Sequence, residues 1–311
     1  MNGNDLRIGI IGGSGVGRSL AQETIADDAK RHEIDTPFGK PSDVIIQTEW
    51  SGVPVFYLSR HGPGHLLNPT AVPYQANIYA MKQLGVTHIL ATGAVGSLRD
   101  EFKPRDLVVP DQVIDKTYKR PATFFDNAAV HVELAQPFCP VLRQVVLDAA
   151  EQLKETKTHG RGCYVAMEGP GFSTKAESLM HRLWGGDLIG MTAMPEAKLA
   201  REAEISYALI ALVTDYDSWK TKPVMDAAPP AEALLDEIIA NLQAATSNAT
   251  ALVRQTVKLL AERRETLPAS IAHDALKLAI WSDKSAIPSD EIERLRVLWG
   301  KHFSVDVPEV H

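Results

Sequence analysis

The sequence predicts an α/β fold built around a parallel or mixed β-sheet, followed by a helical C-terminal extension. Two observations carry this prediction. Short β-branched or apolar runs alternate with helical patterns along most of the chain, and from about Ala231 the pattern becomes helical throughout. In such sheets, ligands bind beyond the carboxyl ends of the strands, so we expect the functional residues there.

The expected strands are short apolar segments, many of which end in Gly, Ser, Thr or an acidic residue. In chain order they are residues 6–12, 54–59, 87–93, 106–110, 162–168, 187–191 and 206–215. Helical spacing of apolar residues appears between several of them, at residues 74–85, 139–154 and 195–204. Pro195 suits the first turn of the last of these helices, because an N–H there would have no partner within the helix.

The C-terminal part is predicted to be helical over residues 234–265 and again after Pro268 and Pro288. We find neither an internal repeat nor a low-complexity linker. The simplest interpretation is one domain over residues 1–265 with a helical extension over residues 266–311.

Composition excludes several classes of function. The 311 residues include 39 acidic and 32 basic side chains, a net charge of −7, and no basic tract, which argues against a nucleic-acid partner. We find no N-terminal signal pattern and no apolar run of the ~18 residues that a membrane span needs, so we expect a cytoplasmic protein without a membrane partner. Cys139 and Cys163 have no metal-ligand spacing and are predicted to be buried, reduced thiols.

The first expected strand ends in a glycine-rich loop. Residues 12–19 read G-x-x-x-x-G-R-S, in which Arg18 replaces the lysine of the phosphate-binding loop of nucleotide hydrolases. Read as a dinucleotide-binding motif, the stretch lacks the third glycine. Its backbone amides and the Ser14 hydroxyl could hold an oxyanion, and a tight glycine turn without a ligand is an equally good interpretation.

Other polar groups also follow expected strands. Arg60 and His61 combine a permanent cation with a group that titrates near neutrality, either at a site or as a surface pair. Residues 91–97 form a second glycine-containing strand end. Asp215 and Asp217 end the most apolar strand, where a carboxylate pair indicates either acid–base chemistry or a solvated turn.

Two further residues allow two interpretations each. Phe172 follows a Gly-Pro-Gly turn and is either a core residue or a stacking platform for a flat ligand. Thr192 precedes a helix and is either an N-terminal cap or a ligand-binding residue.

Six stretches in order resemble the trimeric purine nucleoside phosphorylase family, and most closely its branch acting on 5′-methylthioadenosine. They are GGSG, RHGPGH with PYQANI, GAVGSL, MEGPGFST, GMTAMPEA and VTDYDSW, and the resemblance covers residues 7–245. It implies a single-domain mixed sheet surrounded by helices. It also implies that inorganic phosphate, as a co-substrate, cleaves 5′-methylthioadenosine to adenine and 5-methylthioribose 1-phosphate, with no metal or other cofactor.

The resemblance further implies roles for individual residues. Phosphate would be held by Ser14, Arg60, His61, Gly93, Ala94 and Thr192. The nucleoside would contact Phe172, Ser173, Met191, Ala233 and Leu234, together with His131 from a neighbouring subunit of a homotrimer. Asp215, supported by Asp217, would bind the 6-amino group of adenine and, when protonated, also N7. With His61, these two carboxylates are the expected catalytic residues.

Some features depart from that branch and leave alternatives open. The branch often has Thr in place of Gly93 and Arg in place of Gly171, and it lacks the C-terminal extension. The alternatives are a phosphorylase for adenosine, 5′-deoxyadenosine or methylthioinosine, and a nucleoside-binding protein without turnover. Ala233 and Leu234, where family members acting on ordinary nucleosides have a histidine, favour an apolar 5′ substituent.

Overall fold

The computed structural model describes residues 6–13, 29–153, 157–220 and 231–303, with the backbone alone for residues 231–237. Its strands form one mixed sheet of eleven strands. The main path runs β2 (Lys30–His32), β3 (Ile45–Trp50), β4 (Val53–Ser59), β1 (Ile8–Gly12), β5 (His88–Ser97), β10 (Leu188–Gly190), β9 (Cys163–Ala166) and β7 (Gln112–Asp115). Beside it, β11 (Ser206–Tyr216) pairs with β5 and β6 (Leu107–Val108), and β6 pairs with β8 (Thr158–His159).

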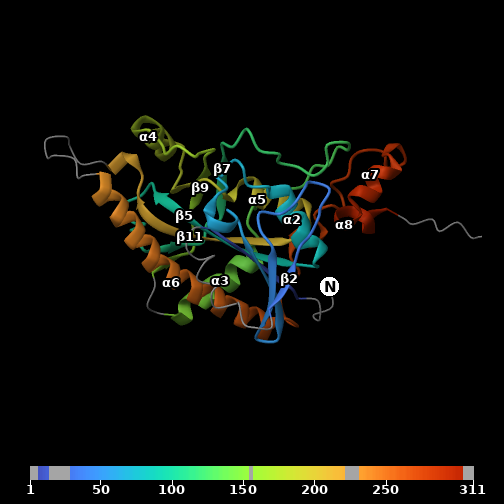
Figure 1. The fold of residues 1–311 in the computed structure, drawn as a ribbon, viewed down its shortest axis with the longest axis horizontal. Helices are drawn as coiled ribbons and strands as arrows, with labels where there is room; N and C mark the ends of the chain where they lie inside the picture. Colours follow the sequence, from blue (N-terminus) through green and yellow to red (C-terminus); the bar gives the residue numbers. More distant parts are fainter. Residues whose placement is uncertain (1–5, 14–28, 154–156, 221–230, 304–311) are drawn as a thin grey trace, which may run out of the picture.

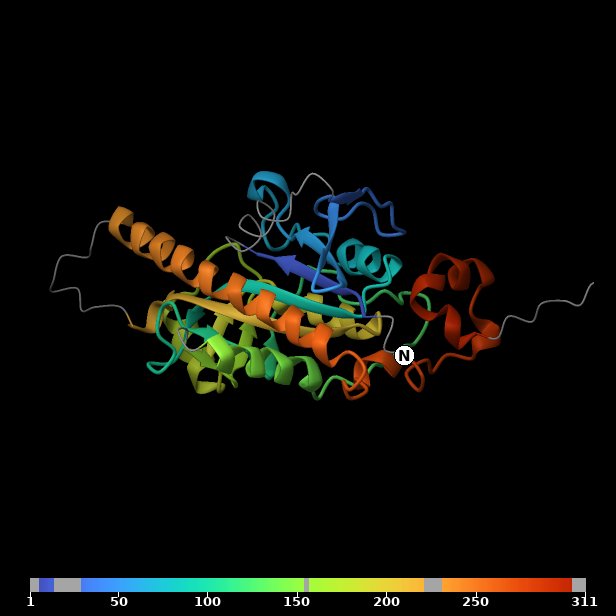
Figure 2. The same cartoon turned by 90° about the horizontal axis from the view of Figure 1, so that it is seen from below.

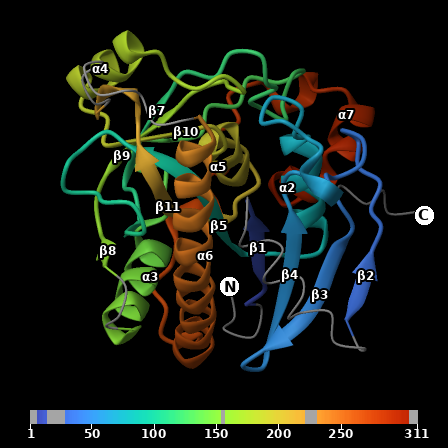
Figure 3. The same cartoon turned by 60° about the vertical axis from the view of Figure 1, so that its left-hand side comes forward.

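Helices cover both faces of the sheet because the central strands are apolar on both sides. In β11, Leu209 and Val213 join one core while Ile210 and Leu212 join the other. The first core is covered by α2 (Tyr74–Gln83) and α5 (Ala193–Glu202), and the second by α3 (Pro140–Leu153) and α6 (Ala231–Arg263). Figure 3 shows α3 and α6 side by side, and Figure 2 shows α6 crossing the sheet along β5 and β11.

Four parallel strands bring their carboxyl ends to one edge. β4, β1, β5 and β11 are neighbours in this order, with Gly12 opposite Ser59 and Ile11 opposite Ala91. A register shift between Val213 and Asp215 then sets Asp215 opposite Gly96. The ends of these strands therefore carry the glycine, arginine and aspartate motifs to a common region.

The predicted α/β class is confirmed, with differences in detail. Residues 91–97 lie wholly within β5, which continues past the expected end at residue 93 and stops at Ser97. Strands β2, β3, β7 and β8 were not expected. Among the described strands, β2 pairs with β3 alone, through the polar sequence Lys-Arg-His, and β8 has just two residues. Between α6 and residue 303, the described helices are all short, among them α7 (Ser289–Arg294) and α8 (Arg296–Trp299).

The C-terminal segment packs on the main domain (Figure 1), at the end of the molecule away from α4 (Lys175–Leu183). Trp299 is fully buried and its ring stacks on Phe125 with centroids 4.8 Å apart. The Tyr79 hydroxyl of α2 donates to the Arg294 carbonyl at 3.2 Å. Residues after 265 thus contribute to the same hydrophobic core as α2. The domain boundary at residue 265 stays a prediction. Among the described helices, none is both long and apolar enough to cross a bilayer.

Candidate active site

Arg60 is a fixed, fully buried cation at the carboxyl edge of the sheet. Its Nε and Nη2 donate to the two carboxylate oxygens of Glu196 at 2.7 and 2.8 Å, and its Nη1 donates to the Thr92 carbonyl at 2.8 Å. Burial lowers the pKa of Arg60, but the Glu196 carboxylate outweighs burial and the net shift is upward. Two-pronged pairing of this kind fixes the plane of the guanidinium as well as its charge.

Backbone segments approach this cation closely. A Cβ on Gly13 would lie 3.0 Å from Arg60 Nη1 and 2.9 Å from the Thr92 carbonyl oxygen, so only glycine fits there without displacement. A Cβ on Gly93 would lie 3.4 Å from Thr192 Oγ1. The structure therefore brings together Gly13, Arg60, Gly93 and Thr192, whereas Ser14 lies outside the described residues.

Thr192 stands at the N-cap position of α5, but its side chain makes no capping hydrogen bond. Its backbone N–H donates to the Tyr164 hydroxyl at 3.3 Å. Met194, the second residue of α5, has extended dihedral angles, so regular helical geometry starts at Pro195, as expected. The Thr192 side chain is therefore not a cap, and its role in ligand binding stays a prediction.

His61 is buried beside Arg60 and stacks on His65 with ring centroids 4.2 Å apart. Burial, reinforced by the Arg60 charge, lowers the pKa of His61 to about 4, so the expectation of titration near neutrality is wrong for this structure. Its Nδ1 lies 2.8 Å from the Leu67 carbonyl oxygen, which can only accept. The proton of the neutral ring is therefore on Nδ1, and Nε2 is a hydrogen-bond acceptor.

The carboxylate pair lies farther along the same edge. A Cβ on Gly96 would lie 3.4 Å from Asp217 Cβ and 3.6 Å from Asp215 Oδ2, so the two acids flank one glycine of β5. The Thr214 hydroxyl donates to Asp215 Oδ1 at 2.6 Å. Asp217 is buried and does not belong to a solvated turn.

The predicted nucleoside contacts are partly assembled. Met191 packs so closely over Gly169 that a Cβ there would lie 2.5 Å from its Sδ. Ser173 is buried, and its carbonyl accepts a hydrogen bond from Ser218 Oγ at 2.7 Å. Phe172 is 84% exposed, so the core interpretation is wrong and its face is open to a ligand or another chain.

The roles of three other predicted residues stay predictions. His131 is exposed, and its ring packs edge-on against Trp281 at 4.6 Å. Its role in a neighbouring subunit stays a prediction. Ala233 and Leu234 belong to the first turn of α6, and their side chains lie outside the described part of the chain.

Sequence reasoning missed the buried acids and cations that hold the site in place. Glu168 ends a predicted strand, and although burial raises its pKa, hydrogen bonds from Tyr118 N, Thr70, Arg120 and Lys119 N outweigh this and lower it to about 2. Arg120 also donates to the carbonyls of Met191 and Met194. The segment that carries Thr192 is therefore fixed by Arg120. No local pattern indicates Glu196, because the need for a carboxylate partner follows only once Arg60 is known to be buried.

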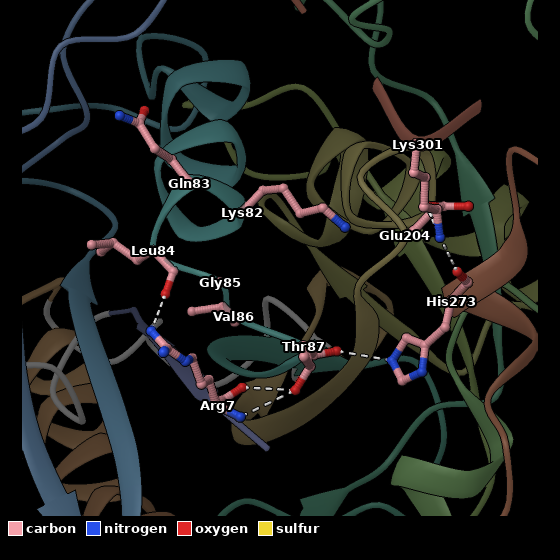
Figure 4. Close-up of a pocket in the computed structure, with 10 residues that line it drawn as sticks. All are labelled: Arg7, Lys82, Gln83, Leu84, Gly85, Val86, Thr87, Glu204, His273 and Lys301. Carbon is pink, nitrogen blue, oxygen red and sulfur yellow. Dashed lines mark hydrogen bonds and ion pairs between the residues drawn. The ribbon is translucent and has the colours of Figure 1, made fainter. Parts of the chain in front are cut away.

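A separate pocket of about 450 Å³ lies at the opposite end of the central strands (Figure 4). Its Arg7 donates to the Leu84 carbonyl at the end of α2, and its Lys301 contacts Glu204 at 2.8 Å and the His273 carbonyl at 3.0 Å. Burial lowers the pKa of Lys82 in this pocket to about 8. The pocket has none of the predicted site residues and lies at the amino ends of the strands, so it is not the candidate active site.

Comparison with known proteins agrees with this geometry. The model of the phosphorylase superfamily matches residues 7–258. The chain belongs to this superfamily. It is 47% identical to the S-methyl-5′-thioadenosine phosphorylases of Synechocystis sp., over 95% of this chain and 87% of the relative, and of Thermosynechococcus vestitus, over 96% and 99%.

Solved structures of the superfamily are also similar. A methylthioadenosine phosphorylase from an antarctic soil metagenomic library is 44% identical with a TM-score of 0.84, over 94% of this chain and 98% of that chain. A mutant adenosine/methylthioadenosine phosphorylase of Schistosoma mansoni, in complex with methylthioadenosine, is 32% identical with a TM-score of 0.77, over 89% and 99%. The fold class predicted from sequence is thereby confirmed.

Proposed function

We propose that this chain cleaves 5′-methylthioadenosine with inorganic phosphate and releases adenine and 5-methylthioribose 1-phosphate. The observation that carries the proposal is a buried cation, Arg60, beside Gly93 and Thr192, on the same strand edge as Asp215 and Asp217. An anion position next to a carboxylate pair matches phosphorolysis of a purine nucleoside. The names of the near full-length relatives support the same reaction.

The reaction separates charge, and the site matches that separation. The bond from C1′ to N9 breaks, its electron pair moves into the purine, and a phosphate oxygen bonds to C1′. Positive charge builds on the sugar, so a fixed anion beneath C1′ stabilises the transition state. Arg60, Thr192 and the amides of Gly93 and Ala94 would hold that anion, and Met191 would lie against the ribose.

His61 would act on phosphate as a hydrogen-bond acceptor. Its Nδ1 proton is directed at the Leu67 carbonyl, so Nε2 offers a lone pair. A phosphate that retains one proton can donate it to this nitrogen. The neutral ring would then orient the phosphate dianion without neutralising its charge.

The base would be read by the carboxylates. Asp215 accepts from the 6-amino group of adenine and, when protonated, donates to N7, which offsets the negative charge developing in the purine. Asp217 and Ser173 would support this contact, and Phe172 would stack on the base. No metal or organic cofactor is proposed, because phosphate itself is the nucleophile. Chelation with EDTA should leave the rate unchanged, and a loss restored by a divalent ion would contradict this.

The proposal extends to assembly and context. A homotrimer would bring His131 of one subunit toward the nucleoside of the next. We propose a cytoplasmic enzyme of purine and methionine salvage. Sedimentation of the purified protein tests the trimer directly.

Adenosine is the second candidate substrate, favoured by the name of the Schistosoma mansoni relative. Phosphate-dependent release of adenine from each nucleoside at saturating phosphate separates the candidates. We expect kcat/KM to favour 5′-methylthioadenosine by at least about tenfold, because an unpaired 5′-hydroxyl costs roughly 1–3 kcal/mol against an apolar wall. Equal values or a preference for adenosine would contradict the apolar wall, and tight binding without product would indicate a nucleoside-binding protein.

A further inference from the structure

Three elements meet behind the carboxylate pair. His181 of α4 is 1% exposed, and its Nε2 lies 2.8 Å from Nζ of Lys116, which follows β7. The start of η3 (Ser218–Lys220), directly after Asp217, is tied to α4 because Trp219 N donates to Ser178 Oγ at 3.2 Å. The ring of Trp219 is also covered by the Arg182 guanidinium at 3.7 Å. The place of α4 beside the base-reading acids is therefore fixed by several contacts.

The contact with Lys116 determines which nitrogen of His181 carries the proton. A lysine ammonium has three donors and no acceptor, so Nε2 of His181 must be the acceptor of this hydrogen bond. The proton of the neutral imidazole is then on Nδ1. Burial lowers the pKa of His181, and the Lys116 charge lowers it further, which keeps the ring neutral. The Trp184 ring packs against both side chains, 5.3 Å from Lys116 Nζ and 5.8 Å from the imidazole.

His181 Nδ1 and Asp217 Oδ2 are both buried and without a hydrogen-bond partner among the described residues. One atom is a donor and the other an acceptor. The Asp217 carboxylate acts to raise the pKa of His181 against burial and the Lys116 charge, so the two groups interact electrostatically, and Glu177 is the other acid that acts in the same direction. A small shift or a single water molecule would satisfy both atoms at once.

We infer that His181, oriented by Lys116, is a positioning residue that donates from Nδ1 to Asp217, keeps this carboxylate ionised and leaves the proton of the pair on Asp215. Asp217 Cβ and Asp215 Oδ2 lie 3.4 and 3.6 Å from the same Cβ position on Gly96, so a hydrogen-bond donor to one acid biases the proton toward the other. The donor behind Asp217 decides on which acid that proton lies. Asp215 then transfers it to purine N7 as the electron pair of the glycosidic bond enters the ring, and water reprotonates Asp215 after adenine leaves.

This inference rests on the proposed base-reading role of Asp215 and Asp217. The test variant is His181→Phe, which keeps an aromatic ring against Trp184 and removes both nitrogens. We expect kcat for 5′-methylthioadenosine at saturating phosphate to fall about tenfold, because part of the proton moves to Asp217. Without the donor, both apparent pKa values of the pair rise, so both limbs of the pH profile of kcat should move to higher pH.

The matched control is His88→Phe. His88 is also a buried imidazole, but it lies at the amino end of β5 against His273, with ring centroids 5.1 Å apart. This variant loses comparable packing and should keep the wild-type pH profile. A His181→Phe enzyme that folds and keeps the wild-type profile would overturn the inference.

A second readout does not depend on turnover. Long-range ¹H–¹⁵N spectra of the wild-type protein should show His181 protonated at Nδ1, and in Lys116→Met the two tautomers should mix. Wild-type protonation at Nε2 would overturn the inference, even if His181→Phe does not fold. An inactive wild type with the Nδ1 tautomer would instead refute the proposed function and leave the orientation of His181 intact.

Discussion

Gly93→Thr should tighten phosphate binding. Among the described residues, a Cβ at this position would meet Thr192 Oγ1 alone, at 3.4 Å, which is an ordinary van der Waals distance. The residue lies within β5, where a β-branched side chain is well tolerated. The new hydroxyl would point into the region between Thr192 and Arg60, where we propose that phosphate binds.

The expected gain follows from the kind of bond added. A hydrogen bond to a charged group contributes about 1.5–3 kcal/mol, and ordering the threonine side chain offsets part of this. A net ~1.4 kcal/mol corresponds to about a tenfold lower Kd for phosphate. Initial rates at varied phosphate and saturating nucleoside, together with calorimetric titration of phosphate, measure the change.

The control is Gly93→Val, which has the shape of threonine without its hydroxyl. It should bind phosphate no more tightly than the wild type. If the threonine and valine variants behave alike, or if both lose phosphate affinity, then residue 93 does not face the phosphate and the anion binds elsewhere.

Three further variants test other parts of the structure. Glu196→Gln leaves the buried Arg60 charge without its partner and should lower the free energy of unfolding by about 3–5 kcal/mol, measured with urea, whereas the exposed Glu293→Gln should change little. Asp215→Asn should depress adenine release strongly and 6-oxopurine release much less, because an amide cannot donate a carboxylic proton; full activity on the adenine substrate would show that another group protonates the base. Lys82→Met should stabilise the protein at pH 7 by at most about 3 kcal/mol, since the lysine has a folded pKa of about 8 against an ordinary 10.5. The unfolded chain binds more protons between these two values, so wild-type stability rises with pH there and the advantage of Lys82→Met should vanish by about pH 10.5; a gain independent of pH would point to packing instead.

The sequence predicted the strands that carry the site because those strands are apolar and end in distinctive residues. β1, β4 and β11 begin and end within two residues of expectation, and Arg60 and Asp215 emerged from their ends alone. The edge strand β2 was not predicted, because its three polar residues show no alternation of apolar and polar side chains. The part of β5 after residue 93 was not predicted, because Gly93 and Gly96 are typical of a turn.

Long-range partners were beyond sequence reasoning for a different reason. Glu196 lies 136 residues from Arg60, and Lys116 lies 65 residues from His181. Nothing in a local pattern specifies such pairs, because a polar residue on a helix is ordinarily solvated. Only the three-dimensional packing of α4 and α5 shows that these side chains are buried and charge-matched.

The burial of Trp299 against Phe125 and α2 has a consequence for synthesis of the chain. The ribosome makes Tyr79 and Phe125 long before the residues that cover them. Until Leu295, Leu298 and Trp299 have left the exit tunnel, that side of the nascent domain remains an open apolar surface. Native closure of this core therefore waits until these residues have been made, and a premature stop codon before Leu295 would release a product with its aromatic residues exposed to chaperones and proteases.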